Sequence, residues 1–125
     1  MYHWARRRPS RALAGQRILV VEDERLIAML VEDSLLDAGA TVVGPAGTVD
    51  EAMRLIEDGG VTAAVLDLKL GEERATPVAD RLARLKVPFV IATGYAIEAG
   101  RHADAPLLCK PFDLERLTSA LVGII

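Results

Sequence analysis

Polar side chains follow four short apolar runs, each with the length of a buried strand. They are the acids Glu22 and Asp23, the acid Asp67, the hydroxyl of Thr93 and the ammonium group of Lys110. A carboxylate at the end of a buried strand costs free energy unless its charge is used. In an open parallel sheet, the carboxyl ends of the strands meet along one crevice. The sequence therefore predicts one site that combines acids, a hydroxyl and an ammonium group.

The acids of this predicted site suit a small, hard cation. Asp23 and Asp67, aided by Glu22, supply oxygen ligands only, which favours Mg²⁺, or Mn²⁺ in its place. Such a cation also relieves the repulsion between clustered carboxylates. Lys110 and Thr93 can offer a charge and a hydrogen bond to an oxyanion near Asp67. An aspartate in these surroundings is an adequate nucleophile for phosphoryl transfer, in which it forms an acyl phosphate.

Length and composition fit one small domain. The chain has 125 residues, 51% of them apolar, which is enough for a substantial core. No apolar run approaches the length of a membrane span, and no secretory signal is visible at the amino terminus. The single cysteine cannot form an internal disulfide. We therefore expect a cytoplasmic protein without membrane contact.

Charge is distributed unevenly along the chain. The net charge is −3, from 15 Lys/Arg and 18 Asp/Glu, but residues 1–15 hold four arginines and no acid. The other 11 basic residues stand against all 18 acids, which leaves −7 for residues 16–125. A domain this acidic is a poor partner for nucleic acid. We expect residues 1–15 to be a flexible basic extension and residues 16–125 to be the domain.

Strand-like and helix-like patterns alternate along the domain. Strands are expected at Ile18–Val21, Thr41–Gly44, Val61–Asp67, Phe89–Ala92 and Leu107–Cys109. Helices are expected at Leu26–Ala38, from Thr48 or Asp50 to about Asp58, from Pro77 to Leu85, from Leu114 to about Val122, and, short or poorly ordered, within Ala96–Asp104. The stretch from Gly71 to Thr76 is expected to be a loop. The pattern predicts an α/β fold: a doubly wound, five-stranded parallel sheet with about five helices.

The order of the site residues resembles the receiver domain of two-component response regulators, over residues 16–125. That family is flavodoxin-like, with strand order 2-1-3-4-5. By this resemblance, Asp67 is the phospho-acceptor, and the phosphotransfer and later autodephosphorylation are self-catalysed rather than the work of an enzyme in the usual sense. The resemblance assigns the other roles as follows: Asp23 is the direct metal ligand, Glu22 its partner acid, Lys69 a metal ligand through its backbone carbonyl, Thr93 the switch hydroxyl, Lys110 the lysine that pairs with the phosphoryl group, and Pro111 a cis-proline.

Two features depart from the common receiver pattern. Leu107 stands where most receivers have a switch Tyr or Phe, three residues before the lysine. The stretch Ile91–Ala96 resembles a stand-alone subgroup with a Phe-Ala-Thr-Gly-x-Tyr signature, although Ile91 replaces its Phe and Tyr95 directly follows the glycine. Lys69 and Tyr95, each two positions after a site residue, are expected to control how long the acyl phosphate survives.

The resemblance implies a single-domain response regulator that takes its phosphoryl group from a sensor histidine kinase or a histidine phosphotransfer protein. Its output would be contact with a downstream protein, with a homodimer as a further possibility. The alternatives are a receiver-like adaptor or phosphate sink without an output switch, and a receiver fragment of a larger hybrid protein. A haloacid-dehalogenase-type phosphatase is disfavoured, because Lys69 stands where its second aspartate should be.

Two further residues are expected to have no part in the chemistry of the site. Cys109 lies in a predicted strand, and we expect a small buried apolar side chain there. His102 is expected to be a solvated loop residue.

Overall fold

Five strands form one parallel sheet. The structure is a computed structural model that describes residues 10–94 and 102–125. The strands of this sheet are β1 (Arg17–Val21), β2 (Thr41–Ala46), β3 (Ala63–Leu66), β6 (Phe89–Thr93) and β7 (Leu107–Cys109). Their order is β2-β1-β3-β6-β7, and every neighbouring pair is parallel. Counted along this sheet the order is 2-1-3-4-5, so the predicted fold class and topology are confirmed.

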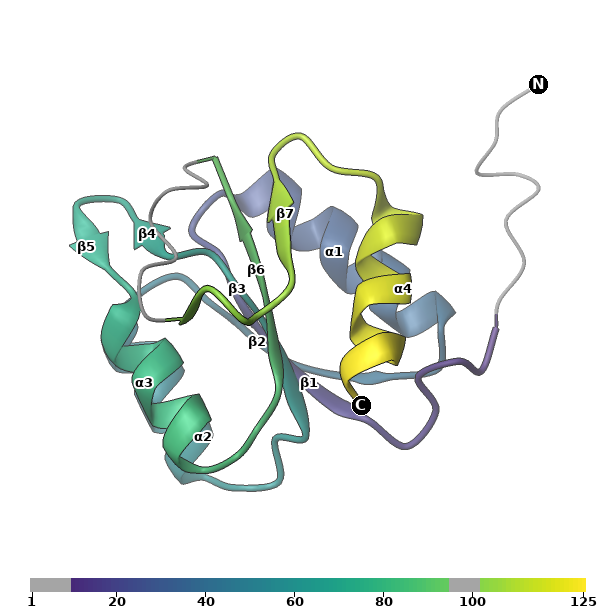
Figure 1. The fold of residues 1–125 in the computed structure, drawn as a ribbon, viewed down its shortest axis with the longest axis horizontal. Helices are drawn as coiled ribbons and strands as arrows, with labels where there is room; N and C mark the ends of the chain where they lie inside the picture. Colours follow the sequence, from purple (N-terminus) through teal and green to yellow (C-terminus); the bar gives the residue numbers. More distant parts are fainter. Residues whose placement is uncertain (1–9, 95–101) are drawn as a thin grey trace.

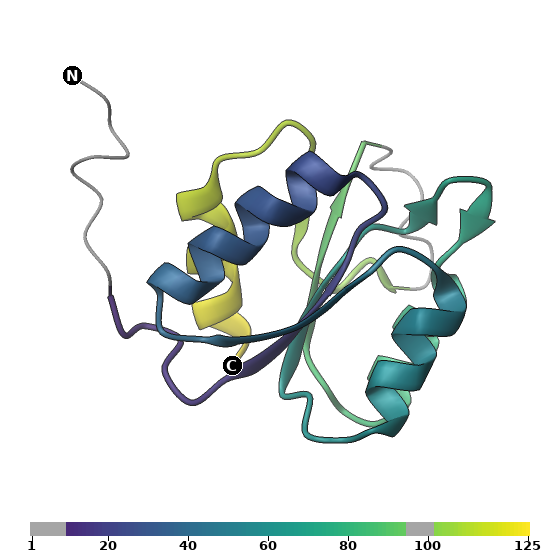
Figure 2. The same cartoon turned by 180° about the vertical axis from the view of Figure 1, so that it is seen from behind.

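Helices cover both faces of the sheet (Figure 1). They are α1 (Arg25–Asp37), α2 (Val49–Glu57), α3 (Thr76–Arg84) and α4 (Leu114–Ile124). Helices α1 and α4 lie on one face, and α2 and α3 lie on the other, as the reverse view also shows (Figure 2). Among the described residues no helix combines the length and the apolar character needed to cross a membrane.

The sheet divides the core in two. Successive side chains of a strand point to opposite faces, so Leu19 and Val21 of β1 join the core under α2 and α3, whereas Ile18 and Val20 join the core under α1 and α4. Both sets are fully or almost fully buried. This two-sided burial explains why the strands are continuous apolar runs rather than alternating ones.

Capping residues fix where the helices begin. Of the two candidates for α2, Thr48 is the cap, since its side-chain oxygen accepts a hydrogen bond from the N–H of Glu51 at 3.2 Å. Asp113 caps α4 in the same way, with its carboxylate accepting from the N–H of Glu115 at 2.9 Å. Pro77 lies in the first turn of α3, as predicted.

A short hairpin replaces the loop that was expected after the third strand of the sheet. Strands β4 (Lys69–Leu70) and β5 (Glu73–Arg74) pair antiparallel across a two-residue turn. Strands of two residues are too short to produce a periodic pattern, which is why the sequence indicated only a loop. Of the expected helix at Ala96–Asp104, residues 96–101 lie outside the described residues. His102 to Ala105 form a tight turn, in which the N–H of Ala105 donates to the carbonyl of His102 at 3.0 Å.

The packed domain begins before the expected boundary at residue 16. Leu13 is fully buried in the core under α1 and α4. The N–H groups of Ser10 and Leu13 donate to the carbonyls of Asp37 and Ala38, at 2.7 and 2.9 Å, and so satisfy backbone acceptors at the end of α1. Residues 10–15 therefore pack onto the domain, and the one large apolar residue among them gave no periodic signal of this.

Leu13→Ala tests whether this segment is part of the domain. We expect the change to lower the free energy of unfolding by about 2–5 kcal/mol, as large-to-small changes at packed sites do. Leu36→Ala is the matched control, because Leu36 is 52% exposed on α1 and surface changes usually stay within about 0.5 kcal/mol. Urea unfolding followed by circular dichroism measures both. Equal effects of the two substitutions would contradict the packing of residues 10–15.

Candidate functional site

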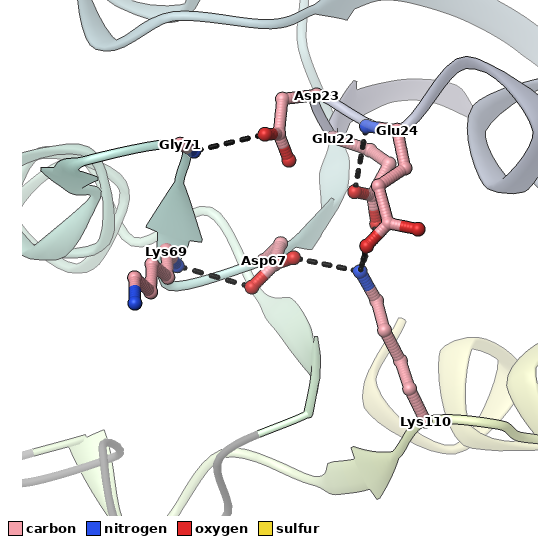
Figure 3. Close-up of polar contacts among 7 residues, drawn as sticks. All are labelled: Glu22, Asp23, Glu24, Asp67, Lys69, Gly71 and Lys110. Atoms are coloured by element: carbon pink, nitrogen blue, oxygen red, sulfur yellow. Dashed lines mark hydrogen bonds and ion pairs between the residues drawn. The ribbon is translucent and has the colours of Figure 1, made fainter.

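The predicted site residues meet at the carboxyl edge of the sheet. Glu22 and Asp23 follow β1, Asp67 follows β3, Thr93 ends β6 and Lys110 follows β7. Because these four strands are parallel and adjacent in the order β1-β3-β6-β7, their ends lie side by side. Figure 3 shows the acids from β1 and Asp67 facing one another, with Lys110 reaching them from below.

Three carboxylates form an oxygen-rich cluster. Glu22, Asp23 and Asp67 each offer one oxygen, and these oxygens lie within 4.8 Å of one another. Glu22 and Asp67 are buried, at 7% and 5% exposure, whereas Asp23 is exposed. A cluster of hard oxygen donors that is open to solvent on one side fits Mg²⁺, which keeps several waters. These residues therefore fit the cation that the sequence suggested.

Lys110 neutralises part of this negative charge. Its Nζ lies 2.7 Å from Asp67 Oδ2, 2.7 Å from Glu22 Oε1 and 3.7 Å from Glu24 Oε1. Its backbone N–H donates to the carbonyl of Thr93 at 2.9 Å, which continues the pairing of β6 with β7 past the strand end. The lysine is thus held at both ends, by the sheet and by the acids.

Burial and pairing shift the pKa values of this group in ways that fit its geometry. Burial raises the pKa of the Glu22 carboxyl, and the hydrogen bond to Lys110 opposes this only in part. Burial alone would lower the pKa of Lys110, but the hydrogen bonds to Asp67 and Glu22 outweigh it and raise that pKa. Lys110 has two carboxylate partners, whereas Glu22 has a single ammonium that it shares with Asp67. Pairing therefore outweighs burial for the pKa of Lys110 but not for the pKa of Glu22. The stabilisation from Lys110 is present below its ordinary pKa of 10.5 and is lost as the pH rises through the raised value.

Backbone N–H groups hold the acids from the other side (Figure 3). The N–H of Lys69 donates to Asp67 Oδ1 at 3.0 Å, and the N–H of Glu24 donates to Glu22 Oε2 at 3.1 Å. Both oxygens of Glu22 therefore already have a partner, one of them Lys110. The N–H of Gly71 donates to Asp23 Oδ2 at 2.8 Å. Sequence reasoning missed Gly71, because its contact depends on the hairpin.

The remaining predicted residues differ in how they relate to this cluster. Thr93 is fully buried at the end of β6. Leu107, in the place of the aromatic switch residue, is half-buried and packs against the core under α2 and α3. Tyr95 lies outside the described residues. The Lys110–Pro111 peptide bond is cis, as the resemblance implied.

Two further residues do not behave as expected. Cys109 is exposed rather than buried, because it ends the edge strand β7, in which Leu108 alone is buried. His102 is not a solvated loop residue: its side chain is 11% exposed, and its Nε2 lies 2.7 Å from Asp80 Oδ1 on α3. The His102 ring also packs edge-on against the ring of Phe89, with 5.5 Å between centroids. These partners are distant in sequence, so no local pattern indicated them.

A pocket of about 700 Å³ opens beside the cluster. Asp67 and Lys110 line its polar end, and Ile27 and Leu30 of α1 with Phe112 line its apolar end. The Asp67 carboxylate is thus reachable from solvent even though it is itself buried.

Comparison with solved structures gives the same fold. SdrG from Sphingomonas melonis Fr1 is 46% identical, with a TM-score of 0.78 over 87% of this chain and 95% of SdrG. A structure of the BeF3-activated conformation of SdrG matches at 44% identity and a TM-score of 0.72, over 90% of this chain and 99% of that one. The response regulator TrrA from Thermotoga maritima, in complex with Mg²⁺ and BeF, is 23% identical with a TM-score of 0.77, over 88% and 99%. This last likeness shows the fold alone.

Curated relatives agree with the structural neighbours. The transcriptional regulatory protein PdtaR of Mycobacterium tuberculosis is 31% identical over 116 residues, which cover 88% of this chain and 57% of PdtaR. The chain spans about half the length of the curated relatives it matches. No family model matches the chain. The fold, the site and these relatives together place the chain among the receiver domains of response regulators.

Lys110→Met tests whether the lysine balances the buried acids. The change keeps most of the side-chain volume and removes the charge, so Glu22 and Asp67 lose their cation. In chelator we expect a loss of about 3–5 kcal/mol of stability, the usual cost when a buried ion pair loses one partner. Added Mg²⁺ should recover more stability in this variant than in the wild type, because bound ligand stabilises the folded state and here replaces the missing charge.

Lys86→Met is the matched control for this measurement. Lys86 is exposed and precedes β6, at the opposite end of the sheet from the site. Thermal unfolding with and without Mg²⁺ compares the two variants. A loss of stability in Lys110→Met no larger than in the control would show that the lysine does not balance the acids.

Proposed function

We propose that this chain acts as a single-domain response regulator that accepts a phosphoryl group on Asp67. The observation that carries the proposal is the contact of Lys110 Nζ with the buried Asp67 carboxylate at 2.7 Å, beside the acid cluster of Glu22 and Asp23. A buried acid with a paired ammonium, a neighbouring cation site and access from a pocket fits a phospho-acceptor better than a structural ion pair.

The proposed step is transfer from a phosphohistidine of a sensor kinase or a histidine phosphotransfer protein. An oxygen of Asp67 attacks phosphorus, the new O–P bond forms, and the N–P bond breaks with its electron pair returning to the imidazole. Lys110 is placed to pair with a phosphoryl oxygen, and the buried hydroxyl of Thr93 is the second donor. Later hydrolysis of the acyl phosphate returns Asp67 to its free form. The protein is thus itself the phosphorylated species and does not act as an enzyme on a separate substrate.

Asp23 and Asp67 would hold the cation, with the carbonyl of Lys69 as a third ligand and Glu22 beside them. Bound Mg²⁺ supplies charge neutralisation for the phosphoryl oxygens. Glu22 shares Lys110 with Asp67 and adds negative charge beside the cation, with its Oε1 on Lys110 Nζ and its Oε2 on the N–H of Glu24. Mn²⁺ has the same preference for oxygen ligands and would occupy the same site.

Phosphorylation adds about −1.5 to −2 charges beside Thr93 and Lys110. Moving a two-state domain almost completely from one state to the other takes about 5.5 kcal/mol. Hydrogen bonds to charged groups contribute about 1.5–3 kcal/mol each, so two such contacts are of the required size. Thr93 and the segment after it would then carry the change to a downstream protein. Lys69 and Tyr95 would govern how water reaches the acyl phosphate.

The alternative is a receiver-like adaptor or phosphate sink that has no output switch. Leu107 favours it in one respect, since a half-buried leucine has no ring that could swing on activation. The complete set of acids, hydroxyl and lysine favours the regulator. A receiver that forms part of a longer hybrid protein would use the same site.

Asp67→Asn tests the acceptor. Incubation with acetyl phosphate and Mg²⁺, followed by intact mass, should show one added phosphoryl group on the wild type and none on the variant. Stability without metal should stay level or rise, since one member of a repelling cluster becomes neutral. Asp58→Asn, an equal change at the exposed end of α2, should be phosphorylated like the wild type. Full phosphorylation of Asp67→Asn would show that Asp67 is not the phospho-acceptor.

Hydrogen exchange with and without beryllofluoride tests the route of the signal. We expect the largest change in protection between Gly94 and Pro106, because Thr93 immediately precedes that stretch and Leu107 cannot act as an aromatic switch. An equal measurement on Asp67→Asn is the control and should show no change. Protection that changes only in β7 and α4 would mean that the signal leaves by another path.

A further inference from the structure

The hairpin that follows Asp67 is built into the core at its base and open at its tip. Leu68, Leu70 and Ala75 are 2%, 3% and 0% exposed and belong to the core under α2 and α3. The N–H of Ala75 donates to the carbonyl of Leu68 at 2.7 Å and closes the base. The turn residues Gly71 and Glu72 stay exposed. The tip is thus an exposed turn on a firmly held base.

The backbone conformation of Gly71 turns the tip of the hairpin toward the acid cluster. It has a φ of 60°, and it is the first of the two turn residues, where hairpin turns of the II′ type place glycine. Its N–H donates to Asp23 Oδ2 at 2.8 Å (Figure 3). Asp23 is the exposed member of the cluster, so little packing restrains its side chain. Burial restrains the carboxylates of Asp67 and Glu22. The exposed carboxylate of Asp23 is restrained instead by the hydrogen bond from Gly71.

The other side of the hairpin contacts helix α2. Glu73 Oε1 accepts a hydrogen bond, long at 3.4 Å, from the N–H of Val49, the first residue of α2. This N–H has no partner within the helix itself. The hairpin thus touches the acid cluster through Gly71 and the start of α2 through Glu73.

We propose that Gly71 is a positioning residue for the metal ligand Asp23, and that the hairpin reports cation occupancy to the start of α2. This inference rests on the proposed function, which makes Asp23 a metal ligand. A carboxylate can bind a cation with one oxygen while the other accepts a hydrogen bond, and such outer partners orient the ligand before the cation arrives. Without Gly71, the exposed Asp23 side chain would have to give up rotational freedom on binding.

Gly71→Pro tests the inference, because proline removes the N–H donor and cannot adopt a positive φ. The dissociation constant for Mg²⁺, measured by isothermal titration without any phosphodonor, should rise about tenfold, the lower end of the usual effect of losing an outer partner. Gly59→Pro is the matched control. Gly59 also has a positive φ, of 84°, and its N–H also donates a hydrogen bond, to the carbonyl of Ile56, but it lies at the far end of α2. We expect the control to lose thermal stability and to keep the Mg²⁺ affinity of the wild type.

A measurement on the wild type decides the matter if Gly71→Pro does not fold. The exchange rate of the Gly71 amide, followed by NMR, should slow severalfold on addition of Mg²⁺, and the Val49 amide should slow with it. The Thr62 amide, which donates to Arg17 at the other end of the sheet, should not respond. Unchanged Mg²⁺ affinity in folded Gly71→Pro, or unchanged exchange at Gly71, would overturn the inference. If the wild type did not bind Mg²⁺ at all, the proposed function itself would be contradicted, rather than only the role of Gly71.

Discussion

The buried carboxylate of Asp67 needs a cation, and the sheet order decides where that cation comes from. An unpaired charge at this depth would cost several kcal/mol. Lys110 follows β7, which is separated from β3 by β6, so the ammonium has to cross the end of one strand to reach the acid. The backbone bond between Lys110 and Thr93 sets the starting point of that reach. Charge balance at the centre of the sheet thus depends on the correct placement of its edge strand.

One lysine cannot balance the whole cluster. Glu22, Asp23 and Asp67 bring three carboxylates to a site where Lys110 supplies a single ammonium within ion-pair distance of two of them. The two buried acids share this lysine, and the exposed one is held by a neutral N–H from Gly71. The site therefore keeps a negative charge on its solvent side. A site of this kind suits a small divalent cation.

Sequence reasoning succeeded where a residue's position follows from a strand end. Asp67 and Thr93 follow or end apolar runs that are buried throughout, and Lys110 follows the short run of the edge strand β7, so all three lie at one edge of the sheet. It failed where position depends on contacts between distant segments. Gly71 meets Asp23 only because a hairpin too short for a pattern turns it there, and His102 meets Asp80 across the fold. Leu13 is the one large apolar residue in its stretch and so formed no pattern, although it is buried as deeply as any strand residue.

The burial of Leu13 has a consequence for the order in which the chain can fold during synthesis. The core under α2 and α3 draws its fully buried members from Leu19 to Ile91. The core under α1 and α4 joins Leu13 to Leu117 and Leu121, near the opposite end of the chain. Contacts between such distant segments form late, because the loop between them must close first. A nascent chain can therefore bury one face of its sheet while the other stays open until α4 has left the ribosome.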